Sequence, residues 1–379
     1  MTIEFTPGKW ISWFFASLFW SLNILLVLYT CLLYYLLHWL PVQHWTAGLL
    51  LITLPLAWAV NLAFILFWIV GQSWRAVLSL VILLTGFWLW PRTFAYEPVG
   101  RNVDGQPTVS IFSYNVMTFD AVNYFPQKKL SATAQAVTRY VCRQTADILC
   151  FQEFYNEPTL PAFNIIERLG RVGYPYYVTL HPSSTKGETG LLGVALFSRY
   201  PILRQGEVIF KEFNGMVWAD VKVGRDTVRI INTHLQSMGI RVTRVFTEDE
   251  IEGVKYETRS ILNALRTGFT DRRVQVQSIE DYINQSPYPV IVTGDFNDTP
   301  YSIVYERLRR RLRNAFEDAG RGFGFTLNRA PSFVRIDNQF YDPRLTAFSF
   351  ETLRDVPFSD HFPILGRFGI KQPTQEAAE

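Results

Sequence analysis

The sequence predicts an N-terminal region of three membrane-spanning helices followed by a mixed α/β globular domain. The first 100 of the 379 residues hold only three of the 36 basic and two of the 33 acidic residues, so the remainder is nearly balanced in charge. From residue 109 onward, short apolar runs alternate with helical stretches, and two runs form a hairpin around Gly224. This pattern favours a mixed sandwich over a purely parallel sheet. Near-neutrality of the second part argues against a protein that mainly grips long nucleic acid through its phosphates.

Three apolar runs predict the membrane region, residues 1–92. Residues 11–37 are an uncharged run of 27, about 40 Å long as a helix, and runs at 47–70 and 74–90 follow. Tryptophans gather near the ends of these runs, as in an aromatic belt. The length of the first run and the two further runs exclude a cleaved signal peptide. A thin Lys and Arg bias favours an N-terminus inside and a globular domain outside. We expect a multi-pass protein of a bacterial inner or plasma membrane.

The rest of the chain divides into a linker at 93–107, a globular domain at 108–370 and a flexible tail at 371–379. Pro and Gly without apolar periodicity predict the linker. Cys31 lies in a predicted span and Cys150 in a predicted buried strand, so no disulfide framework is expected. The predicted strands are 109–116, 148–151, 193–197, 207–210, 217–223, 227–232 and 290–294, and the predicted helices are 132–144, 163–169, most of 239–285, and 303–315.

Polar residues follow several predicted strands. The run from Val290 ends at Gly294 and delivers Asp295 and Asn297 to one face, with Phe296 turned into the core. A carboxylate and a carboxamide at this point suit a hard cation, a water or a phosphate. The alternative is a capped turn before a helix. Further polar residues at or near strand ends are Asn115, Glu153, His234, Asp337, Asp360 and His361.

These residues lie in motifs that resemble those of the endonuclease/exonuclease/phosphatase superfamily, over about residues 108–369. The motifs are Ser-Tyr-Asn-Val, Phe-Gln-Glu, Asn-Thr-His-Leu, Gly-Asp-Phe-Asn, Arg-Ile-Asp and Ser-Asp-His. The resemblance implies an α+β fold, a four-layer α/β sandwich of two packed β-sheets flanked by helices, here preceded by three transmembrane helices. It extends to a membrane-anchored branch of that family, and it implies a metal-dependent phosphoesterase with its site at one open edge.

For the metal, the resemblance implies that Glu153 anchors Mg²⁺, with Mn²⁺ as an alternative. Mg²⁺ prefers one or two carboxylates together with waters and substrate phosphate. Asn115 and Asp360 would complete or orient that shell. Whether one or two metal ions bind stays open.

For the reaction, the resemblance implies that Asp295, helped by Asn297, orients or deprotonates the attacking water. His361 would contact the phosphate, with Asp337 fixing its orientation. His234 would protonate the leaving oxygen. The choice of base between Asp295 and His361 stays open.

Two substrate classes remain. A lipid-linked phosphate or pyrophosphate fits the apolar N-terminal region. A nucleic acid, which a membrane-tethered nuclease would cut, fits the motif set. The nuclease would use a basic run whose other interpretation is a solvated helix face: Arg307, Arg309, Arg310, Arg311 and Arg313. A non-catalytic binding module is disfavoured by the intact polar set. Residues 236–270 are expected to shape the rim of the site. The lipid bilayer is an expected partner, and no protein partner is predicted.

Overall fold

The computed structural model describes residues 7–40, 44–96, 107–181, 190–238 and 251–370. The tail at 371–379 and most of the expected linker lie outside these ranges. The chain divides into two compact units. The first contains residues 1–90 and 301–306, and the second contains residues 91–300 and 307–379. Each unit is described separately.

The first unit is built from apolar helices. They are α1 (Pro7–Trp39), α2 (Trp45–Leu51), α3 (Leu54–Val70), α4 (Ala76–Thr85) and η1 (Phe87–Leu89), with α5 (Trp90–Thr93) reaching into the second unit. Among the described residues, two helices, at 13–39 and 45–70, are long and apolar enough to cross a membrane. The pair at 76–85 and 87–93 is bent by 51° and makes a third span if it is counted as one. The number of spans is therefore two or three, against the three expected.

Buried polar side chains connect the apolar helices. Asn23 Nδ2 donates to Ser79 Oγ at 2.6 Å, and Trp68 Nε1 donates to Asn23 Oδ1 at 3.1 Å. Asn61 Nδ2 donates to Thr30 Oγ1 at 3.0 Å. Hydrogen bonds of this kind hold helices together where apolar surface alone gives no preference for association.

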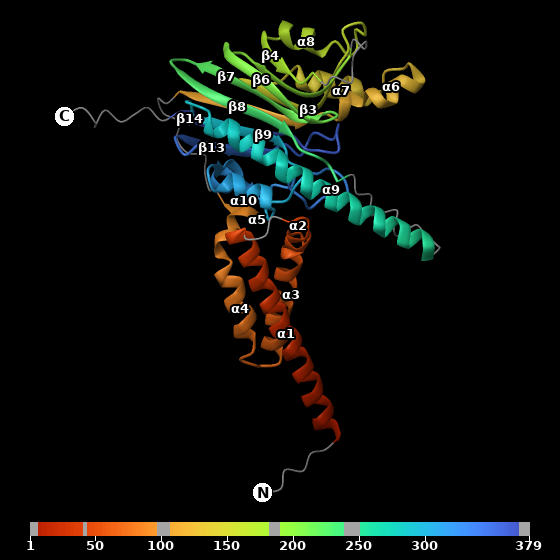
Figure 1. Cartoon of the computed structure of the whole chain (residues 1–379), viewed down its shortest axis with the longest axis vertical. Coiled ribbons are helices and arrows are strands. Elements are labelled where there is room, and N and C mark those ends of the chain that lie inside the picture. Colours follow the sequence, from red (N-terminus) through yellow and green to blue (C-terminus); the bar gives the residue numbers. More distant parts are fainter. Residues whose placement is uncertain (1–6, 41–43, 97–106, 182–189, 239–250, 371–379) are drawn as a thin grey trace, which may run out of the picture. The chain divides into compact units, whose positions relative to one another are not determined.

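The second unit contains two six-stranded mixed sheets among the described residues (Figure 1). One sheet has the order β10-β12-β9-β8-β7-β6, and the other has the order β13-β14-β2-β3-β5-β4. The strands of the first are β6 (Ile202–Lys211), β7 (Asn214–Val223), β8 (Asp226–His234), β9 (Val290–Asp295), β10 (Arg313–Asn314) and β12 (Asp337–Tyr341). Those of the second are β2 (Thr108–Asn115), β3 (Ile148–Asn156), β4 (Tyr176–Thr179), β5 (Leu191–Ser198), β13 (Leu345–Thr352) and β14 (Ile364–Ile370).

Helices cover the outer faces of the two sheets, giving the four layers expected. An apolar core between the sheets includes Ile111, Val217 and Ile291. On the β3 side, α7 (Ala132–Val141) and α8 (Ile165–Arg171) close a second core rich in aromatic rings (Figure 1). The long helix α9 (Ile251–Asn284) runs along the other sheet, where Arg229 Nη1 donates to the Tyr282 carbonyl at 3.2 Å.

Several predicted boundaries differ from the structure. Residues 303–315 form α10 (Ile303–Arg309), then β10, then α11 (Ala315–Ala319), because the Asn314 side chain accepts from the amides of Phe316 and Glu317 and starts a new helix. Strand β12 was not predicted because three of its five residues are polar. Part of the expected linker forms β1 (Ala95–Tyr96), which pairs with β11 (Arg321–Gly322).

Candidate active site

Three adjacent strands bring three of the predicted site residues together at the same end of the strands. His234 ends β8 and is the parallel register partner of Asp295, which ends β9. Asp337 begins β12 and is the antiparallel partner of the same Asp295. Strands β8 and β9 approach closely at Gly294, whose φ is +135°. An added Cβ there would lie 2.0 Å from the Thr233 carbonyl oxygen. Strand pairing therefore fixes the spacing of these side chains.

The two carboxylate oxygens of Asp295 have different neighbours. Oδ1 accepts from the Asn297 amide at 2.8 Å, so it stabilises the turn after the strand. Oδ2 accepts from Asn115 Nδ2 at 3.1 Å and lies 3.6 Å from Nε2 of both His234 and His361. The one side chain thus stabilises the turn through Oδ1 and faces other predicted site residues through Oδ2.

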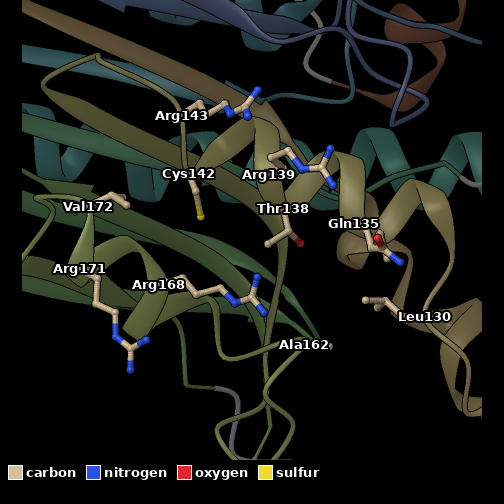
Figure 2. A pocket seen from close by; sticks show the side chains of 11 residues that line it. Leu130, Gln135, Thr138, Arg139, Cys142, Arg143, Ala162, Arg168, Arg171 and Val172 are labelled. Atoms are coloured by element: carbon tan, nitrogen blue, oxygen red, sulfur yellow. The ribbon is translucent and has the colours of Figure 1, made fainter.

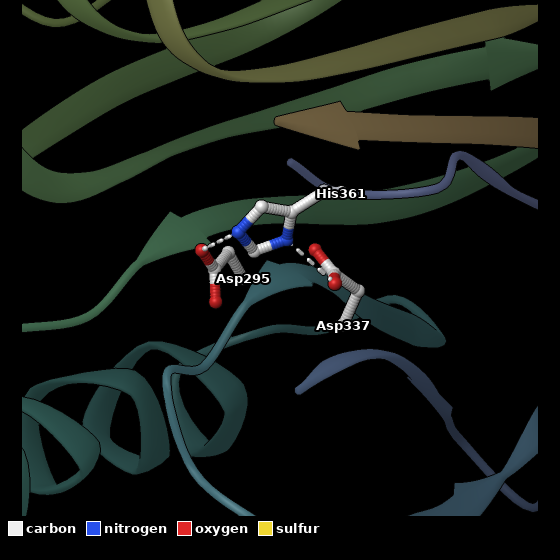
Figure 3. Close-up of side chains that lie close together, drawn as sticks. All are labelled: Asp295, Asp337 and His361. Carbon is white, nitrogen blue, oxygen red and sulfur yellow. Dashed lines mark hydrogen bonds and ion pairs between the residues drawn. The ribbon is translucent and has the colours of Figure 1, made fainter. Parts of the chain in front are cut away.

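His361 lies between two carboxylates, as Figure 3 shows. Its Nδ1 is 2.9 Å from Asp337 Oδ2, and its Nε2 faces Asp295. Burial lowers the pKa of His361, but Asp337 and then Asp295 oppose burial and raise this pKa to about 10. Burial also raises the pKa of Asp337, while His361 lowers it. The two carboxylates therefore favour the protonated imidazole.

Asn297 and Phe296 follow Asp295 in a turn. The ring of Phe296 is buried and packs edge-on against Phe340 with centroids 5.3 Å apart, as the alternation predicted. Asn297 has φ +50°, and its Nδ2 donates to the Leu235 carbonyl at 2.9 Å. Asn297 therefore ties the end of β9 to the chain that follows His234.

Asn115 joins this group to Glu153. Its Nδ2 donates both to Glu153 Oε1 at 3.2 Å and to Asp295 Oδ2 at 3.1 Å, while its Oδ1 accepts from the Met117 amide at 3.1 Å. Glu153 does not follow β3 as expected; it lies inside the strand, at an irregularity in the pairing with β5, with φ +48°. Such bulges re-aim side chains near active sites.

The oxygen atoms gathered here fit a hard divalent cation as ligands. Two carboxylates, Glu153 and Asp295, share a single neutral amide donor, and oxygen ligands are those that Mg²⁺ and Mn²⁺ accept. By side-chain proximity, Asp295, Asp337 and His361 also form a group that could hold a metal ion, with one ligand atom each within 4.8 Å of the others.

Asp360 lies beside this group but pairs with a cation. Its Oδ2 is 3.2 Å from Arg329 Nε. The neighbouring Ser359 Oγ donates to the Asn115 carbonyl at 2.7 Å, so the loop carrying Asp360 and His361 is fastened to the end of β2. All eight predicted residues thus contribute to one region, with Asp360 and Asn297 at its margin.

One supporting pair was missed in the sequence. Arg272 on α9 is fully buried; its Nε lies 3.1 Å from Asp298 Oδ2, and its Nη1 donates to the Gln236 carbonyl at 3.0 Å. It therefore clamps the segments that follow His234 and Asn297. An arginine inside a charge-rich helix carries no sequence signal for such a role. Of the expected rim at 236–270, residues 239–250 lie outside the described ranges.

A separate cavity of about 580 Å³ lies between α7 and α8. Figure 2 shows Thr138, Cys142 and Arg168 directed into it, whereas Arg171 points away. None of the predicted site residues lines this cavity. The carboxylate and histidine group instead lies at the ends of strands β8, β9 and β12.

Three arginines of the basic run near α10 pair with acidic groups, and a fourth contacts an amide. Arg309 forms a bidentate pair with Glu317, at 2.9 Å for the closest contact, and Arg313 pairs with Asp318 at 2.9 Å. Glu280 binds Arg307, and Asn284 binds Arg311. Three arginines of the run are therefore paired with acids, namely Glu317, Asp318 and Glu280.

Comparison with solved structures gives similar folds at low sequence identity. The chain is 16% identical to an endonuclease/exonuclease/phosphatase from Beutenbergia cavernae, with a TM-score of 0.49 over 70% of this chain and 72% of that one. It is 18% identical to the human Nocturnin catalytic domain (TM-score 0.49; 71% and 97% covered). It is 16% identical to a mannosyl-6-phosphatase from Bacteroides thetaiotaomicron (TM-score 0.48; 69% and 99% covered). No curated protein matches the chain.

Two family models match the sequence. A domain of unknown function matches residues 16–93. The model of the endonuclease/exonuclease/phosphatase family matches residues 102–361, which include every member of the site from Asn115 to His361. Members of that family are metal-dependent enzymes that hydrolyse phosphate esters. The chain therefore belongs to the endonuclease/exonuclease/phosphatase family.

Proposed function

We propose that this protein is a membrane-anchored, Mg²⁺-dependent phosphoesterase that hydrolyses a phosphate ester or pyrophosphate on a lipid-linked substrate, with its catalytic unit outside a bacterial inner membrane. The observation that carries the proposal is the arrangement around Asp295. One carboxylate oxygen faces two imidazoles and an amide, and the amide leads to a second carboxylate at Glu153.

Glu153 would hold the Mg²⁺, with Asn115 and Asp360 completing or orienting its ligands. When bound, the ion supplies charge that neutralises phosphate oxygens. The short distance from Asn115 to both carboxylates supports this role, because the amide keeps them side by side without adding charge. Asp360 would need to exchange its Arg329 partner for the ion or its waters.

The pKa of His361 helps to choose the base. A group that stays protonated at neutral pH cannot take a proton from water, but it can donate a hydrogen bond to a phosphate oxygen. Because Asp337 holds its Nδ1 at 2.9 Å, Nε2, which lies 3.6 Å from Asp295 Oδ2, is the nitrogen that would face the phosphate. Asp295 is then the group that orients or deprotonates the attacking water, and the Asn297 backbone amide fixes its other oxygen.

His234 is the second imidazole and the candidate acid for the leaving oxygen. Its Nε2 lies 3.6 Å from Asp295 Oδ2, and its buried Nδ1 has no hydrogen-bond partner among the described residues. A histidine without a fixed tautomer can carry a proton on either nitrogen. The two imidazoles have different carboxylate contacts and can thus take different roles. His361 would remain a cation, and His234 would donate a proton to the leaving oxygen.

The choice of a lipid over a nucleic acid rests on two features. The apolar unit contains two helices long enough to cross a membrane, and a third if the bent pair counts as one span. The arginine run that a nuclease would use is largely paired, with Glu317, Asp318 and Glu280 taking three of its guanidinium groups. Paired arginines have less charge left to bind a phosphate backbone.

The test is phosphate release by the purified, detergent-solubilised protein with Mg²⁺. A polyprenyl pyrophosphate is compared with single-stranded and double-stranded DNA, and His361→Ala controls for contaminating enzymes. The proposal predicts release from the lipid that the variant lacks. Cleavage of DNA with the lipid left intact would replace it with a membrane-tethered nuclease.

A further inference from the structure

The second unit exposes a cluster of aromatic side chains close in sequence to its active-site loop. Phe94 and Phe323 are each about half exposed, and their rings meet edge to face at 5.2 Å. Phe323 stacks on Phe325 at 5.3 Å. We call these three residues the aromatic rim. Exposed apolar clusters of this kind mark surfaces that bind another apolar body.

The rim is tied directly to the site through Thr326, the residue after Phe325. Thr326 Oγ1 accepts from the Asp337 amide at 3.2 Å, and the Thr326 carbonyl accepts from the Phe362 amide at 2.7 Å. The next residue, Leu327, forms a β-bridge with His361. Residues 323 to 327 therefore carry the chain from the rim to the Asp337 and His361 pair.

The return arm of the same loop exposes a further ring. Thr326 N donates to the Val334 carbonyl at 3.0 Å, which pairs the two arms. Phe333, the residue before Val334, is 69% exposed, the largest exposed fraction of any phenylalanine in the described residues. Leaving this ring in water is unfavourable unless something covers it during function.

Exposed arginines flank the rim. Arg321 precedes the rim in sequence, and the Arg354 guanidinium lies 5.7 Å from the centre of the Phe325 ring. Aromatic rings edged by arginines match the bilayer interface, where rings lie at headgroup level and cations attract anionic lipids. Phe94 is also the first residue after the helix at 87–93, the last part of the candidate bent span. Phe94 therefore follows the candidate span directly in the sequence.

We infer that the aromatic rim and Phe333 bind the surface of the bilayer that carries the substrate and so present the lipid phosphate to His361 and Asp295. The inference rests on the proposed function, since it names how that site reaches a lipid-linked substrate. The apolar part of the substrate stays in the bilayer, and only its phosphate enters the site.

The first experiment maps contact with lipid and needs no activity. The full-length protein is reconstituted into phosphatidylcholine and phosphatidylglycerol vesicles containing a diazirine-bearing phospholipid, irradiated and digested. Labelling of the peptide covering residues 321–335, together with the helices at 13–39 and 45–70, is the expected result. The peptide carrying Phe213, 40% exposed in the turn between β6 and β7, should stay unlabelled.

The outcomes separate the two proposals. Labelled helices with an unlabelled 321–335 peptide would overturn the inference and leave membrane anchoring intact. Unlabelled helices would overturn membrane anchoring itself, and the inference with it.

The second experiment uses the double variant Phe323→Ser/Phe333→Ser in the same vesicles, with Phe213→Ser as the matched control. Hydrolysis of a lipid pyrophosphate in the bilayer should fall about tenfold or more, the effect expected from losing one to two buried rings. Hydrolysis of water-soluble p-nitrophenyl phosphate should stay within about twofold, because neither ring contributes to the site chemistry. Equal loss on both substrates, or no loss on the lipid, would contradict the inference.

Discussion

Replacing Gly294 with alanine should cost activity as well as stability. An added Cβ would lie 2.0 Å from the Thr233 carbonyl oxygen and 2.9 Å from the Thr233 carbonyl carbon, whereas Cβ atoms essentially never approach other heavy atoms closer than 3.0 Å. Strands β8 and β9 must therefore separate by about 1 Å next to the His234 and Asp295 pair. A displacement of that size at reacting groups costs roughly 100-fold in rate.

Gly224→Ala is the matched control. Gly224 also has a positive φ, +60°, but an added Cβ there would meet nothing within 4 Å. Both variants carry backbone strain of about 1–3 kcal/mol, yet only Gly294→Ala moves the site. The assay is hydrolysis of p-nitrophenyl phosphate and of a lipid pyrophosphate with Mg²⁺, alongside thermal unfolding. If Gly294→Ala kept activity within about threefold of Gly224→Ala, strand spacing would not set the site geometry.

Three further variants test the surroundings of the site. Arg272→Met should lower the free energy of unfolding by about 3–5 kcal/mol, because Asp298 would stay buried without its counter-charge, and adding Asp298→Asn should recover part of that loss in denaturant unfolding. Asn115→Asp places a third carboxylate against Glu153 and Asp295, so the metal-free protein should melt at a lower temperature than the wild type. Mg²⁺ should then raise its melting temperature more than it raises that of the wild type. Equal increases would contradict the donor role of Asn115. His361 has its pKa raised from 6.5 to about 10, so its stabilising contribution is complete below pH 6.5 and is lost as pH rises through 10. The melting temperature of the metal-free protein should fall over that range, and His361→Asn should flatten the fall.

The strands that carry the site could be predicted because they are buried on both faces. Strand β9 from Val290 reads as an apolar run, strand β8 carries Val228, Ile230 and Ile231 among polar residues, and their carboxyl ends hold Asp295 and His234. Strand β12 reads Asp-Asn-Gln-Phe-Tyr and gave no such signal, although all five residues are buried. One of its polar side chains bonds across the sandwich, where Gln339 Nε2 donates to the Ile111 carbonyl at 2.9 Å. A partner so distant in sequence cannot be found from local pattern.

The site residues could be listed from the motifs, but their contacts could not. The sequence left the base undecided between Asp295 and His361, and the pair of carboxylates around His361 is visible only once β9, β12 and the 359–361 loop meet. Arg272 shows the same limit, because its partners Asp298 and Gln236 lie 26 and 36 residues away. Long-range electrostatics is set by the fold rather than by local composition.

The most direct test of the account is a Mg²⁺ titration of phosphate release by the metal-stripped protein, its Glu153→Gln variant and its His361→Asn variant. The account predicts no activity without metal and an increase of about tenfold or more in the Mg²⁺ concentration that Glu153→Gln needs for half-maximal rate. His361→Asn should instead lower turnover by roughly 100-fold or more at an unchanged Mg²⁺ requirement. Activity in the absence of metal, or wild-type behaviour in both variants, would contradict it.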